Sequence, residues 1–335
     1  VLAVDRLGVR VGSSVGGQTA GPSAGPVTGL VAALVAAVAP FLVVADAGAV
    51  GGSLVALVAV LFAILAFDGR WLAAGSAGGL LVLARPGALV VVAVVACWVG
   101  SRFEWRLAGR LVVVAAVGVF PFVQRNALVL EVPVLSTSWG ATLSGAYSVE
   151  ARRDGVGLDV AADERFDVVV PHGAEGPEGI EVLALLDPAR RDDEGTWNRA
   201  LQEHALAGLA AHPRQLVAVL GTNSLVLLGL HDPPEHLTTG GPGALELVGA
   251  LLWPVVAVAG LVGLWPNRRN PAVVLVGGMG LAFVVLDLLT LAGTPTRAPV
   301  QAVACIGDGL LVAAVATPRS RTDPPPPAEG PSDQR

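Results

Sequence analysis

Long apolar runs alternate along this chain with short turns that carry arginine, and one long polar stretch interrupts the alternation. An α-helix rises 1.5 Å per residue, so roughly 20 apolar residues match the ~30 Å hydrocarbon core of a bilayer. The pattern predicts a mainly α fold, a polytopic membrane protein with about eight transmembrane helices in two blocks, 27–124 and 244–317. The predicted spans lie at 27–44, 51–67, 71–84, 87–104, 107–124, 244–264, 272–292 and 298–317.

The stretch from Val119 to Leu143 joins the first apolar block to the polar region, and the sequence pattern of the whole chain is organised around it. The apolar run ends at Phe120-Pro121-Phe122, and Arg125-Asn126 follow directly. Apolar residues then alternate with others over 127–135, which predicts a strand. A cluster of Ser, Thr, Trp and Gly at 136–140 predicts a turn after it.

The polar stretch is expected to form a small extracytoplasmic α/β domain over residues 125–243. A second strand is predicted at 166–170, and a helix from Asp193 to the stop at His212-Pro213. The run 216–230 is short for a crossing and carries polar residues at its middle, so we expect a helix along the membrane surface.

The arginines of the turns predict which side each turn faces. If the spans alternate in direction across the membrane, ten of these arginines lie on the same side of it. The positive-inside rule assigns that side to the cytoplasm. This assignment needs 71–84 and 87–104 to be two short helices rather than one long helix through Pro86. We expect the lead 1–26 to be interfacial or cytoplasmic and the Pro-rich tail 318–335 to be a disordered cytoplasmic segment. The set comprises Arg6, Arg10, Arg70, Arg102, Arg106, Arg110, Arg268, Arg269, Arg319 and Arg321.

Composition narrows the class further. The chain is 53% hydrophobic and only 14% charged, which excludes an ordinary soluble domain. The acids gather in the polar stretch and in the tail, so a nucleic-acid partner is not expected. Cys97 and Cys305 both lie in apolar runs and predict no disulfide, and the five histidines lack ligand spacing, so no metal site is predicted.

Three arginines remain on the opposite, outer side: Arg85, Arg125 and Arg297. Each lies at a predicted membrane boundary close to a proline, where short loops are normally poor in basic residues. A guanidinium group binds phosphate oxygens with charge-assisted bonds, so the set predicts a phosphate site at the outer leaflet. The alternative is that each side chain extends separately to membrane lipid head groups. Trp139 is placed to stack on a sugar ring, although tryptophan is also common at interfaces without ligands.

Four stretches, in this order, resemble the membrane glycosyltransferases of the GT-C class, in the branch of the dolichyl-phosphate-mannose protein mannosyltransferases and aminoarabinose transferases: AAGSAGGLLVLARPGALVVV, VGVFPFVQRNALVLEVPVLSTSWGATL, TWNRALQEHALAGLAAHPRQL and TPTRAPVQAVACIGDGLLVA. The resemblance covers about residues 5–317. It implies transfer of a sugar from a polyprenyl-phosphate donor on the outer face of the plasma membrane. By position, it implies that Arg85, Arg125, Asn126 and Arg297 contact the lipid phosphate or the sugar. Such enzymes can use a divalent metal, for which this chain displays no ligand set.

The chain departs from this family at the catalytic acids. The loop after the family's first helix, which carries the base, has no counterpart here, so Val1–Arg335 alone is expected not to catalyse transfer. Asp46 is the candidate catalytic residue, but Gly51-Gly52 stand where a partner glutamate would be. The alternative function is a transporter-like or structural multi-pass protein that displays a small outer domain. Asp287 and Asp308 are the intramembrane acids that proton-coupled transport would need, and the sequence suggests no basic partner for either.

Overall fold

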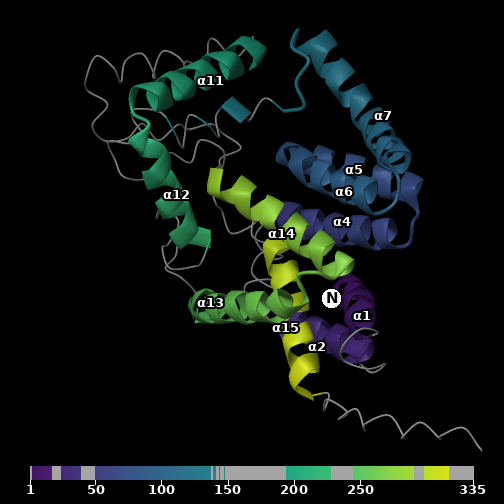
Figure 1. The fold of residues 1–335 in the computed structure, drawn as a ribbon. Helices are drawn as coiled ribbons and strands as arrows, with labels where there is room; N and C mark the ends of the chain where they lie inside the picture. Colours follow the sequence, from purple (N-terminus) through teal and green to yellow (C-terminus); the bar gives the residue numbers. More distant parts are fainter. Residues whose placement is uncertain are drawn as a thin grey trace, which may run out of the picture.

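The computed structural model (Figure 1) describes residues 2–16, 24–38, 50–136, 139–140, 143, 147, 194–227, 244–289 and 298–316. Over these residues the chain is mainly helical, and they include no strand. In Figure 1, α14 crosses the middle of the helical assembly, whereas α7 lies at its edge.

A helix lies at each of the eight positions where the apolar pattern predicted one, so the mainly helical fold is confirmed. The helix predicted from Asp193 is present as α11 (Glu194–Ala211), and the run 216–230 begins within α12 (Arg214–Leu227). The eight helices are α2 (Ala24–Val38), α4 (Val50–Phe67), α5 (Trp71–Ala84), α6 (Leu89–Arg102), α7 (Trp105–Val129), α13 (Ala244–Leu264), α14 (Pro271–Leu289) and α15 (Ala298–Ala316).

The N-terminal lead contains a helix that the sequence analysis did not predict, α1 (Leu2–Gly16). Its apolar side chains Val4, Leu7 and Val11 recur every three or four residues and are buried in the main core. Arg10 on the same helix forms an ion pair with Asp68, in the turn after α4. The Gly and Ser residues between the apolar positions concealed this amphipathic pattern in the sequence.

The strand predicted at 127–135 is wrong. α7 continues to Val129, and the residues after it form bends rather than extended structure. Glu131 has a φ of 57°, in the left-handed region, which a strand does not accommodate. Leu128 and Val129 are consecutive and both exposed on the last turn of this helix, whereas a strand would turn them to opposite faces. The strand predicted at 166–170 lies outside the described residues.

The connection between α5 and α6 is broken as predicted. α5 ends at Ala84, Arg85 adopts an extended conformation with φ −149° and ψ 101°, and Pro86 opens a 3₁₀ turn, Pro86–Ala88, that leads into α6. A proline ring disfavours the helical conformation for the residue before it. The two short helices therefore do not merge, which leaves the Arg85 side chain at their junction.

At the opposite end of these helices, contacts join turns that are distant in sequence. Trp98 Nε1 near the end of α6 donates a hydrogen bond to the carbonyl of Pro271 at 2.8 Å, at the start of α14. Asn270 Nδ2 donates to the carbonyl of Ser14 at 3.0 Å, at the end of α1. The end of α6 and the start of α14 thus lie at one end of the assembly, which is the arrangement that alternating helices require.

Glycines allow several helix backbones to approach closely. A Cβ at Gly79 of α5 would lie 2.9 Å from the carbonyl oxygen of Ala115 in α7, and one at Gly75 would lie 2.7 Å from that of Leu111. A Cβ at Gly260 of α13 would likewise lie 2.6 Å from the carbonyl oxygen of Ala304 in α15. Small residues at four-residue spacing are the contacts through which membrane helices commonly pack.

Candidate functional site

The strongest charged feature among the described residues is the Arg85–Asp287 ion pair. The guanidinium Nη2 of Arg85 donates to Asp287 Oδ1 in the last turns of α14. The Asp287 side chain is fully buried, and that of Arg85 is 16% exposed. Arg85 Cζ also lies 5.9 Å from the centre of the Phe283 ring, one helical turn before Asp287. The pair fixes the guanidinium group, on a partly buried side chain, at the junction of α5 and α6.

This contact corrects the expectation that Asp287 has no basic partner. The sequence did contain a signal for it, because the predicted topology placed Arg85 and Asp287 at the same boundary. Two charges that approach an apolar interior are expected to pair, since burial of either alone is costly. The sequence could not show that α14 lies next to the α5–α6 junction rather than elsewhere in the assembly.

The last turn of α14 is held by two further contacts from the polar region. Tyr147 donates its hydroxyl to the carbonyl of Leu289 at 2.8 Å, and Asn223 Nδ2 of α12 donates to the carbonyl of Leu288 at 3.0 Å. The final carbonyls of a helix have no partner within it, so these donors act as caps. Burial raises the pKa of the Tyr147 phenol above its ordinary value. Three consecutive residues of α14 are therefore each held by a different part of the chain.

The other predicted site residues lie apart from this pair or outside the described residues. Arg125 is exposed near the end of α7 and donates from Nη1 to Asn126 Oδ1 at 3.2 Å. Asn126 in turn donates from Nδ2 to the carbonyl of Val134 at 2.8 Å, so it fixes the chain after α7. Trp139 is 39% exposed. Asp46 and Arg297 lie outside the described residues, so convergence of the three arginines stays a prediction.

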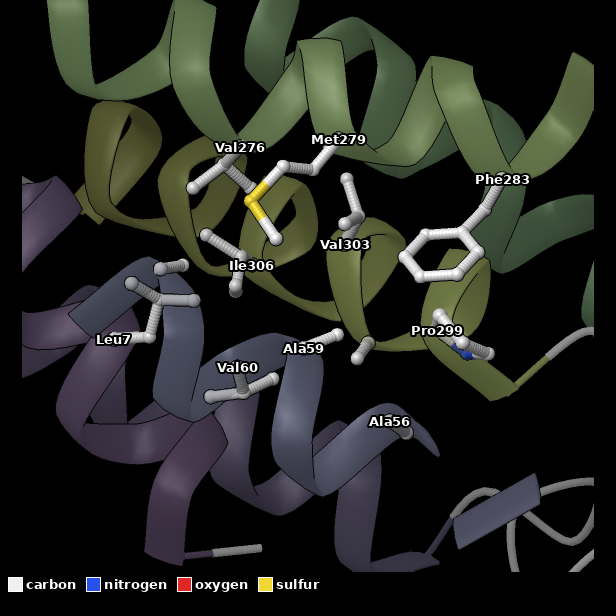
Figure 2. A pocket seen from close by; sticks show the side chains of 12 residues that line it. Leu7, Ala56, Ala59, Val60, Val276, Met279, Phe283, Pro299, Val303 and Ile306 are labelled. Carbon is white, nitrogen blue, oxygen red and sulfur yellow. The ribbon is translucent and has the colours of Figure 1, made fainter. Parts of the chain in front are cut away.

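An apolar cavity lies between α1, α4, α14 and α15, with Phe283 in its lining (Figure 2). The cavity is small, with a volume of about 20 Å³, it is open on one side, and its lining residues are all apolar. α1, α4, α14 and α15 contribute to it, with Leu7 and Phe283 among the larger side chains. Phe283 also faces Arg85, so the same ring borders both the cavity and the guanidinium group.

The described residues offer no metal-binding group of side chains, and comparison with other proteins found no match. The described residues contain no group of three or more His, Cys, Asp and Glu side chains that could hold a metal ion. No family model, curated protein or solved structure matches the chain. Two described helices are long and apolar enough to cross a membrane, α7 with 17% of its apolar window buried and α14 with 56%.

Proposed function

We propose that the chain is a multi-pass plasma-membrane protein in which all eight apolar helices span the bilayer and residues 125–243 face outward. The observation that supports a bilayer is the exposed apolar surface of α7, where Val113 is 60%, Val117 66% and Phe120 62% exposed. Soluble proteins rarely expose contiguous apolar surface of this kind. Lipid chains would cover it without a cost in hydration.

The orientation is supported by aromatic and basic side chains at the end opposite Arg85. The ring centres of Trp71, at the start of α5, and Phe103, directly after α6, lie 5.1 Å apart. Arg268 Cζ lies 4.7 Å from the ring centre of Trp265. Aromatic rings gather at membrane interfaces, and arginines gather on the cytoplasmic side. This end therefore faces the cytoplasm in the proposal, and Arg85 faces the outer leaflet.

Within that membrane protein, we propose a glycosyltransferase that takes its sugar from a polyprenyl-phosphate donor on the outer face. The single observation that carries this function is the fixed guanidinium of Arg85 against the Phe283 ring, which also lines an apolar cavity. A phosphate at the outer boundary would accept charge-assisted bonds from Arg85, while Asp287 holds that side chain in place. The apolar chain would lie along Phe283 and the cavity. Asp46 remains the candidate base, and Arg125, Asn126, Arg297 and Trp139 the candidate donor contacts.

A second candidate is a transporter-like membrane protein. It is favoured by the burial of two acids in adjacent membrane helices, Asp287 at 0% and Asp308 at 7% exposure. Acids inside a membrane protein are costly and commonly mark a path for ions or protons. Binding of a lipid phosphate at Arg85 favours the first candidate, and proton-linked flux without lipid binding favours the second.

Single cysteines test the topology. Ser101 and Gln124 are exposed near opposite ends of the predicted crossings, α6 and α7. In a background with Cys97 and Cys305 changed to Ala, Ser101→Cys is expected to react with an impermeant thiol reagent only from the cytoplasmic side and Gln124→Cys only from outside. Labelling of both from one side would contradict the alternation.

Donor binding tests the function. The purified chain in lipid nanodiscs is expected to bind a polyprenyl phosphate more tightly than the corresponding polyprenol, because only the phosphate engages Arg85. Arg85→Gln should abolish this preference, whereas Arg106→Gln, an exposed arginine at the other end, serves as the matched control and should keep it. Equal binding of phosphate and alcohol by the unaltered chain would reject Arg85 as the phosphate site.

A further inference from the structure

One face of α15 carries a line of buried polar side chains that the proposed donor site does not use. Gln301, Cys305 and Asp308 follow one another at spacings of four and three residues, which places them on one side of a helix. Their exposures are 1%, 0% and 7%. The apolar cavity is lined by other positions of the same helix, among them Val303 and Ile306. This polar face is therefore separate from the cavity and from Arg85.

Three oxygen atoms on this face lack a hydrogen-bond donor among the described residues: Gln301 Oε1 and both carboxylate oxygens of Asp308. A buried polar group without a partner costs free energy, and an isolated buried carboxylate costs far more. Such groups in native proteins usually hold a water molecule, an ion or a proton. The two side chains come from separate turns of α15, so the feature does not depend on one residue.

The helices packed against α15 offer Asp308 no described cation. α13 and α2 both pack closely on α15: a Cβ at Gly263 would meet the carbonyl oxygen of Gly307, and a Cβ at Gly309 would meet that of Thr28. The sequences of α2 and α4 contain no ionisable side chain at all. Of the charged groups on the other neighbours, Arg10 is paired with Asp68, Asp287 is paired with Arg85, Arg6 is exposed, and Asp5 lies beside Gly29. Glu246, in the first turn of α13, lies outside the described side chains.

We propose that Asp308 is a proton-binding site, with its carboxyl group held as the neutral acid inside the helix assembly and with water completing the hydrogen bonds of the Gln301–Asp308 face. Uptake of one proton from solvent converts the carboxylate to the acid and removes the buried charge. The new O–H becomes a donor, and a water molecule on this face supplies the donors that Gln301 Oε1 requires. A cation in place of the proton would need several oxygen ligands around it, and Gln301 lies two turns away along the helix.

This site is independent of donor binding at Arg85. It supplies the second candidate function with an exchangeable proton near the middle of a predicted span, where proton relays in membrane proteins place their acids. It also adds a role for Gln301, which neither candidate function uses.

Infrared spectroscopy of the purified full chain tests the proposal. At neutral pH the unaltered protein is expected to give the carbonyl band of a protonated carboxylic acid, and Asp308→Asn to lack it. Asp68→Asn is the matched control, because Asp68 is 26% exposed and paired with Arg10, and it should retain the band. Transfer to D₂O should shift the band, since water reaches the site in the proposal.

One further variant and one further measurement keep the test decisive. If Asp308→Asn does not fold, Asp308→Glu should show the band displaced in frequency, and an undisplaced band would overturn the assignment. Identical spectra for the unaltered protein and Asp308→Asn would also overturn it. Absence of the band, together with stabilisation of the unaltered protein but not of Asp308→Asn by sodium or lithium, would replace the proton by a cation and reject the proposal.

Discussion

α7 and α14 are the two described helices long and apolar enough to cross a membrane, and they differ strongly in how much of their surface is buried. Only 17% of the apolar window of α7 is buried, against 56% for α14. α7 touches its neighbours along one narrow face, where Ala108, Leu111 and Ala115 are buried. α14 buries residues along its whole length and contacts helices on several sides.

The ends of the two helices differ even more. α14 is fixed at its start by Trp98 and Asn270, and at its end by Arg85, Asn223 and Tyr147. The end of α7 has the exposed Arg125. Apolar composition alone therefore does not decide whether a helix lies exposed at the edge of the assembly or buried inside it. Polar residues at the helix ends and small residues on partner faces make that decision.

The largest expected effect comes from breaking the ion pair that holds α14. Asp287→Asn removes the charge that faces Arg85, and loss of one partner of a buried pair typically costs about 3–5 kcal/mol. Asp68→Asn is a matched change in an Arg–Asp pair with exposures of 42% and 26%, for which about 0–1 kcal/mol is expected. Unfolding of both variants in detergent measures the difference.

The double variant Arg85→Leu/Asp287→Leu sharpens this result. Replacement of both partners of a buried pair by apolar residues is often neutral or stabilising, so we expect the double variant to recover most of the loss. If Asp287→Asn and Asp68→Asn lower the free energy of unfolding equally, the buried Arg85–Asp287 pair contributes no more to stability than the exposed Arg10–Asp68 pair.

An intermediate effect is expected where α7 packs on α5. Gly79→Leu would press a side chain against the backbone of Ala115, which cannot move aside, and overpacking typically costs about 1–3 kcal/mol. A Cβ at Gly118 of α7 would meet no atom within 4 Å. Gly118→Leu should therefore be accommodated, and it improves helix propensity by up to about 1 kcal/mol. Thermal unfolding should rank the two variants on opposite sides of the unaltered protein. A destabilised Gly118→Leu would mean that this face of α7 is covered by another helix.

The positions of the eight apolar helices were predictable because each long apolar run is bounded by polar turns, most of which carry arginine, which leaves few other places for a helix to begin or end. The break at Pro86 was predictable for the same reason, since the ring excludes a continuous helix. The strand at 127–135 failed because the short alternating pattern runs across the end of α7 at Val129 into irregular structure, where periodicity does not report the backbone conformation.

The organising role of α14 was not predictable from one sequence. Val119–Leu143 stood out because composition changes there, yet a composition change marks a boundary and not a contact. The Arg85–Asp287 pair joins residues that are 202 positions apart, and only the packing of helices reveals it. The sequence singled out Asp308 as an acid without a basic partner, but it did not indicate that Gln301 lies on the same buried face or that its oxygen lacks a donor among the described residues.

The smallest effect concerns the cap at the end of α14, where Tyr147→Phe removes one hydrogen bond to Leu289 and is expected to cost about 0.5–1.5 kcal/mol. Tyr147 is the only tyrosine of the chain, so its ultraviolet absorbance reports its ionisation without interference from another tyrosine. Because burial raises the pKa of this phenol, the folded chain keeps the proton at a pH where the unfolded chain, with an ordinary value near ~10, has lost it. The folded state therefore binds more protons in that window, and stability falls as pH rises above about 10. Tyr147→Phe should lack both the absorbance change and this part of the pH dependence. Titration at the ordinary value in the folded protein would show that Tyr147 is solvated and that α14 ends without this cap.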